Sequence, residues 1–80
     1  MRATVLVRPK AGILDPQGQA VEGALRQLGF AVSEASIGRV VDLEFEASDR
    51  ESARADLERM CAQLLANPLI ESFEIELEDA

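Results

Sequence analysis

The stretch Phe73-Glu74-Ile75-Glu76-Leu77-Glu78 decides the fold class, because its apolar and acidic residues alternate without a break. Such alternation is typical of a β-strand with one face toward a core and the other toward solvent. Residues 2–8 and 40–46 alternate in a similar way, with Leu6 out of register. These segments predict strands whose inward faces carry Ala3, Val5 and Val7, then Val41, Leu43 and Phe45, then Phe73, Ile75 and Leu77.

The residues after the first strand predict an amphipathic helix. Asp15-Pro16 is typical of a helix start, because the carboxylate can accept hydrogen bonds from free backbone N–H groups and proline suits the first turn. Gly29 is a suitable exit residue. Between them, five apolar residues recur at helical spacing: Ala20, Val21, Ala24, Leu25 and Leu28.

A second helix is predicted before the last strand. Ser48 and Glu51 have the spacing of a capping box. The helix is expected to end at Asn67-Pro68, with Asn67 in the left-handed conformation. Its apolar stripe comprises Ala53, Leu57, Met60, Cys61 and Leu64.

The weakly patterned residues 30–36 complete the expected fold as a further strand, joined to residues 40–46 by a turn at Gly38-Arg39. The resulting order is βαββαβ, the ferredoxin-like arrangement of the α+β class. It predicts a four-stranded antiparallel sheet with both helices on one face and the first and third strands in the middle. Residues 1–80 are expected to form a single domain.

The helix-free face of this sheet is predicted to place a basic strand between two acidic ones. Its first strand carries Arg2, Thr4, Leu6 and Arg8 on that face. Opposite charges on neighbouring strands attract, although each exposed pair contributes only roughly 0.2 to 1 kcal/mol. Cross-strand pairing is therefore expected to fix the register more than the stability.

Composition narrows the class of protein. The chain of 80 residues has one cysteine and no histidine, so it offers neither an intrachain disulfide nor a recognisable zinc or iron–sulfur ligand set. A domain of this size has a small core, and oligomerisation is the expected additional support.

The net charge of -7 argues against nucleic acid as a binding partner. The first apolar run is too short for a signal peptide, and a cytoplasmic protein without membrane attachment is expected.

The sequence offers no reactive constellation. Cys61 lies on an apolar stripe without an adjacent base, and the glutamates of the last strand are expected to be solvated. Neither catalysis by this chain alone nor a cofactor is expected. Residues 8–18 form an unusual loop directly before the N-terminus of a helix, a place where anions can bind. The alternative interpretation of this loop is a tight connection between strand and helix.

Three blocks of residues resemble the PurS family. They are Arg8-Pro9-Lys10, Gly12, Leu14-Asp15-Pro16-Gln17-Gly18 and Ala20; then Ala24-Leu25, Leu28-Gly29 and Gly38-Arg39; then residues 64–76, LLANPLIESFEIE. The resemblance covers essentially the whole chain. Departures are Arg39 in place of a common lysine, Ser36 in place of arginine and Phe73 in place of tyrosine.

The resemblance implies an accessory subunit of phosphoribosylformylglycinamidine synthase, a glutamine-dependent, ATP-consuming ligase of purine biosynthesis. Such a subunit forms a homodimer or higher oligomer, bridges the glutaminase subunit PurQ and the synthetase subunit PurL, and assists ammonia transfer. Ten residues are the predicted interface or chain-geometry positions: Arg8, Lys10, Gly12, Asp15, Pro16, Gly18, Gly38, Arg39, Asn67 and Pro68.

Two alternatives share the expected fold. The first is a regulatory module of the ACT type, which would bind an amino acid at a dimer interface near Gly12 and Asp15. The second is an acylphosphatase-like enzyme, against which the position of Asn67, after the second helix, counts.

Overall fold

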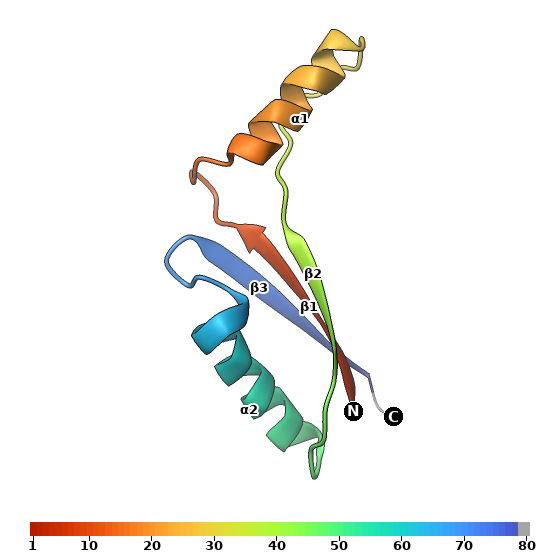
Figure 1. The fold of residues 1–80 in the computed structure, drawn as a ribbon, viewed down its shortest axis with the longest axis vertical. Coiled ribbons are helices and arrows are strands. Elements are labelled where there is room, and N and C mark those ends of the chain that lie inside the picture. Colours follow the sequence, from red (N-terminus) through yellow and green to blue (C-terminus); the bar gives the residue numbers. More distant parts are fainter. Residues whose placement is uncertain (79–80) are drawn as a thin grey trace.

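The computed structural model describes residues 1–78 as a three-stranded antiparallel sheet with helices (Figure 1). Strand β1 lies between β2 and β3. In chain order, the elements are β1 (Arg2–Pro9), α1 (Pro16–Gln27), β2 (Arg39–Glu44), α2 (Arg50–Met60), the π-helical turn η1 (Cys61–Leu65) and β3 (Glu71–Glu78). The α+β class and the three alternating strands agree with the sequence.

The core lies between β1 and α2. Ala3, Val5 and Val7 are buried on one face of β1, where they meet Leu57 and Cys61. Full burial of an aliphatic side chain such as Leu57 contributes about 1.5 to 3 kcal/mol. Other predicted inward residues pack against this cluster while remaining half-buried: Val41, Leu43, Phe45, Ile75 and Leu77.

The expected four-stranded sheet is wrong. Residues 30–38 form no strand; side chains of α1 hold their backbone instead. Arg26 donates to the carbonyl oxygens of Val32 and Ser33, each at 2.8 Å, and Glu22 Oε1 accepts from Ala35 N at 3.1 Å. With these groups occupied, the segment returns along the helix and leaves β2 as an edge strand.

The predicted hairpin turn at Gly38-Arg39 is also wrong, because there is no preceding strand to join. Arg39 is the first residue of β2. Gly38 lies against β1, where an added Cβ would come within 2.1 Å of Val7 O. The glycine therefore permits a close backbone approach.

The two helices do not share one sheet face. Helix α2 lies along the sheet, whereas α1 projects beyond its end (Figure 1). The molecule is consequently long and thin, with extents of 51 × 26 × 14 Å. Val21 on α1 is 40% exposed, and Leu28, the C-cap residue of the helix, is 73% exposed. The periodicity of α1 was correctly predicted, but its apolar face is not covered by the sheet of the same chain.

The helix ends agree with the sequence only in part. Asp15 caps α1 as predicted, and Gly29 has a φ of 96° after its last turn. The capping box on α2 is wrong, because Asp49 Oδ1 accepts from Ser52 N at 2.7 Å. The left-handed Asn67 is wrong as well, since no non-glycine residue in residues 1–78 has a positive φ.

The predicted environments of the thiol and of the exposed sheet face are confirmed. Burial raises the pKa of the Cys61 thiol, and the charge of Glu58 adds to this effect. On the helix-free face, Arg2 pairs with Glu44 at 3.0 Å and Arg8 with Glu74 at 3.1 Å. Within residues 1–78, neither helix has the length and apolar character needed to cross a bilayer.

Candidate functional site

Three connections meet at the end of the sheet from which α1 projects. We call this region the junction and define it as residues 8–18, 36–39 and 65–71. All ten predicted site residues lie within it. The junction is where the sheet, the end of η1 and the start of α1 are held together.

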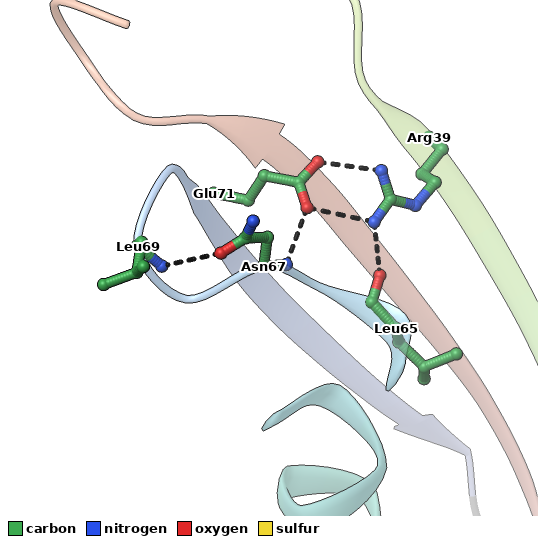
Figure 2. A network of polar contacts seen from close by, with 5 residues as sticks. All are labelled: Arg39, Leu65, Asn67, Leu69 and Glu71. Atoms are coloured by element: carbon green, nitrogen blue, oxygen red, sulfur yellow. Dashed lines mark hydrogen bonds and ion pairs between the residues drawn. The ribbon is translucent and has the colours of Figure 1, made fainter. Parts of the chain in front are cut away.

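Arg39 and Glu71 form the centre of the junction (Figure 2). The Arg39 guanidinium donates to both Glu71 carboxylate oxygens, at 2.8 and 3.0 Å, and to Leu65 O at 2.5 Å. Glu71 Oε1 also accepts from Asn67 N at 2.7 Å. The paired geometry joins β2, the end of η1 and the start of β3 through charge-assisted hydrogen bonds.

The Asn67-Pro68 turn is bound on both sides. Asn67 Oδ1 accepts from Leu69 N at 3.1 Å, and Asn67 O accepts from Glu71 N at 2.7 Å. From the other side, Lys10 Nζ donates to Pro68 O at 2.7 Å. Lys10 N also donates to Ile70 O at 2.8 Å, so this residue ties the end of β1 to the turn.

Asp15 holds the start of α1 and the segment that returns from it through hydrogen bonds to Gly18 and Ile37. Its Oδ1 accepts from Gly18 N at 3.0 Å, and its Oδ2 accepts from Ile37 N at 2.8 Å. Gly18 is buried, and an added Cβ would come within 2.5 Å of Ala35 O. One carboxylate therefore caps the helix and anchors the returning chain, and Gly18 allows the two segments to approach.

The remaining predicted residues have more peripheral positions. Arg8 pairs with Glu74 on the helix-free face, Pro16 occupies the first turn of α1, and Gly12 has a φ of 83° in the loop. A φ of this sign favours glycine. Nothing lies within 4 Å of the Cβ that Gly12 lacks, so its conformation rather than its packing requires glycine.

The carboxylates of the junction are stabilised in their ionised form. The hydrogen bond from Arg39, followed by that from Asn67 N–H, lowers the pKa of Glu71. Glu71 in turn raises the pKa of Arg39. Backbone N–H groups of Ile37 and Gly18 lower the pKa of Asp15. Carboxylates held this way accept hydrogen bonds and do not serve as proton donors near neutral pH.

An open groove of about 370 Å³ follows the junction, and apolar side chains line much of it. Its lining residues are Pro9, Ile13, Leu14, Asp15, Pro16, Gln17, Ile37, Gly38, Arg39, Ile70 and Glu71. In residues 1–78, no group of three or more histidine, cysteine, aspartate or glutamate residues could hold a metal ion.

Glu71 is the main residue that the sequence-based site prediction omitted. Its side chain is only 17% exposed, and its two oxygens accept hydrogen bonds from the Arg39 guanidinium. The sequence did contain an indication of this role, because Glu71 lies an even number of residues before Ile75 and Leu77 and so falls on the same, inward face of the strand. A carboxylate at an apolar register position indicates a specific partner.

The family model of PurS, described as phosphoribosylformylglycinamidine (FGAM) synthase, matches residues 2–79. This chain belongs to the PurS family. A curated relative, the PurS subunit of phosphoribosylformylglycinamidine synthase from Methanocaldococcus jannaschii, is 38% identical over 78 residues, covering 96% of this chain and 94% of the relative. The resemblance noted in the sequence is thus confirmed.

Solved structures of the family have the same fold. The structure of PurS from B. subtilis matches with a TM-score of 0.87 at 38% identity, covering 98% of each chain. The structure of PurLQS from Thermotoga maritima contains a chain that matches with a TM-score of 0.84 at 30% identity, covering 94% of this chain and 93% of that one. The chain is therefore a PurS-type subunit of FGAM synthase, as predicted.

Proposed function

We propose that this chain assembles with the PurL and PurQ subunits of its host and bridges them, so that ammonia released from glutamine reaches the synthetase. The observation that carries this proposal is the match to a chain of PurLQS over 94% of this chain at 30% identity. The junction supports an adapter role, because its polar groups are engaged in internal contacts that fix the geometry of the chain. A rigid adapter can position two partners and exclude water between them.

The predicted interface role of the ten junction residues is part of this proposal. Their internal bonds fix the loops, while apolar neighbours on the same surface remain available for contact. Ile13 is 37% exposed and Leu14 is 70% exposed. Exposed apolar groups beside a rigid polar frame are typical of a docking surface.

Self-association is the second part of the proposal. Helix α1 projects beyond the sheet (Figure 1), and apolar side chains on it and just after it, Val21, Leu28 and Phe30, are exposed. A second copy offers the same unpaired face, and an isologous contact between the two would cover both. The thin monomer needs such support because its buried core is small. We further propose a cytoplasmic location, which suits a free buried thiol.

The amino-acid-binding alternative has less support from the geometry. Both carboxylate oxygens of Asp15 already accept backbone hydrogen bonds, from Gly18 and from Ile37. An amino group bound there would share these oxygens with the two backbone donors. Thermal denaturation with each amino acid at about a hundred times a trial Kd addresses this alternative, because a true ligand would add about 2.7 kcal/mol of stability.

The test of the proposal is reconstitution of the host's PurL and PurQ with and without this chain. We expect glutamine-dependent FGAM synthesis to require the chain, and ammonia-dependent synthesis by PurL alone to be independent of it. If the glutamine-dependent rate and the formation of the complex are both unaffected by its omission, the proposal is wrong.

A further inference from the structure

The outer edge of β3 carries backbone groups without a partner. In residues 1–78, β3 pairs only with β1. Met1 O accepts from Phe45 N on the β2 side, whereas Lys10 N donates to Ile70 O on the β3 side. Because the bonding direction alternates along an antiparallel strand, odd-numbered residues of β1 bond to β2 and even-numbered residues bond to β3.

This alternation identifies the free groups. The even-numbered residues of β1 lie opposite Ser72, Glu74, Glu76 and Glu78, so the backbone groups of Phe73, Ile75 and Leu77 face outward. Arg50 Nη1 donates to Leu77 O at 3.4 Å, in agreement with that orientation. No described contact reaches the outward N–H and C=O groups of Phe73 and Ile75. An extended segment can bind such an edge through main-chain hydrogen bonds.

The side chains of β3 define which segment fits. Glu74, Glu76 and Glu78 are exposed on the helix-free face. Arg8 pairs with Glu74, but among residues 1–78 no base pairs with the other two. On the opposite face, Phe73 is 38% exposed. A strand with basic residues on one face and apolar residues on the other complements this pattern.

The charges also exclude other occupants. Two β3 strands from separate copies would place glutamates beside glutamates, and like charges at such positions are destabilising. Edge charges normally prevent pairing, and here they discriminate against neutral or acidic segments while favouring basic ones. The β2 edge lacks this character, because Glu44 already pairs with Arg2 and Asp42 with Thr4.

We infer that the outer edge of β3 is the docking surface for an extended basic segment of a partner protein, which binds as an added strand along residues 73–77. The inference rests on the proposed function, because it takes the partner to be a subunit of the assembly. It names the surface of this chain and the chemistry of the segment that the surface receives.

The backbone contribution is tested with a capped eight-residue peptide of alternating arginine and valine, added to the full chain and followed by hydrogen exchange. We expect slower exchange at the amides of Phe73 and Ile75. The matched probes are two N-methylated versions of this peptide, one methylated at its odd-numbered amides and the other at its even-numbered amides. Both keep the charge of the peptide, and each lacks the main-chain donors on one of its two edges. Equal binding of both methylated peptides, or protection confined to other residues, would overturn the inference.

The charge contribution is tested with the triple variant Glu74→Gln, Glu76→Gln, Glu78→Gln. We expect its Kd for the peptide to rise about tenfold, whereas Asp42→Asn with Glu44→Gln on β2 should change it less than about twofold. The same variants are then titrated into the PurL and PurQ reconstitution. If the wild-type chain supports glutamine-dependent synthesis and the triple variant does so at the same half-maximal concentration, the inference is wrong while the proposed function stands. If the wild-type chain has no effect, the proposed function itself fails.

Discussion

The guanidinium of Arg39 and the carboxylate of Glu71 form two hydrogen bonds, at 2.8 and 3.0 Å, across 32 positions of sequence. Arg39 begins β2 and Glu71 begins β3, so this pair joins the two edge strands at the end where α1 departs. Glu71 is mostly covered, unlike Glu44, whose side chain is 75% exposed in its pair with Arg2. The two ion pairs therefore allow a matched comparison.

Replacement of Arg39 by lysine is expected to lower the melting temperature. Lysine offers a single ammonium group and cannot donate in parallel to both Glu71 oxygens while also reaching Leu65 O. The control is Arg2→Lys, in an exposed pair that contributes little. Thermal unfolding followed by circular dichroism checks the order of the two variants. An equal drop in melting temperature for both variants would show that the Arg39–Glu71 pair contributes no more to stability than the exposed Arg2–Glu44 pair.

The lowered carboxylate pKa values predict loss of stability in acid. The pKa of Glu71 lies below its ordinary value of 4.5, with the Arg39 hydrogen bond as the largest cause. Its contribution is complete above pH 4.5 and is lost as the pH falls through the lower pKa of the folded chain. Asp15 behaves in the same way below 3.8. Chemical denaturation from about pH 7 to about pH 3 should show this decline.

Glu71→Gln provides the control for that decline, because glutamine does not titrate. The variant should be less stable near neutral pH, and its free energy of unfolding should fall less steeply below pH 4.5 than that of the wild type. Parallel pH profiles for the two proteins would contradict the assignment.

The pattern of residues correctly predicted the three alternating strands, because alternation depends on the local position of each side chain relative to one sheet. It failed at residues 30–38, where the partners are side chains on α1 and not a neighbouring strand. The direction of α1 also escaped prediction, since an apolar stripe does not specify what covers it. Within the junction, the turn residues were recognisable locally, whereas the Glu71 partnership depends on Arg39, far away in sequence.

Two glycines of the junction are expected to be intolerant of alanine. At Gly38 an added Cβ would meet Val7 O at 2.1 Å, and at Gly18 it would meet Ala35 O at 2.5 Å. Because a backbone oxygen obstructs each position, and at Gly18 Asp15 Oδ2 also lies at 2.5 Å, we expect each variant to lose about 1 to 3 kcal/mol of stability. Gly23→Ala in the middle of α1 is the matched control, since nothing lies within 4 Å of its missing Cβ. That change should stabilise the chain by about 0.5 to 1 kcal/mol. Urea denaturation measures all three, and stabilisation by Gly38→Ala would contradict the close approach of β1.

Charged residues on the exposed apolar face of α1 are expected to weaken the dimer. Val21→Asp with Leu28→Asp places two charges on the face proposed to meet a second copy, where burial would strip them of water. We expect the dissociation constant of the dimer to rise by at least about tenfold in sedimentation, while the circular dichroism spectrum stays helical. Leu64→Asp with Leu69→Asp is the control, because both leucines are 82% exposed, Leu64 on η1 and Leu69 in the turn that follows Asn67-Pro68. A dimer that resists the α1 variant and dissociates with the control would place the contact between copies on η1 and the Asn67-Pro68 turn, and would leave α1 free for a different partner.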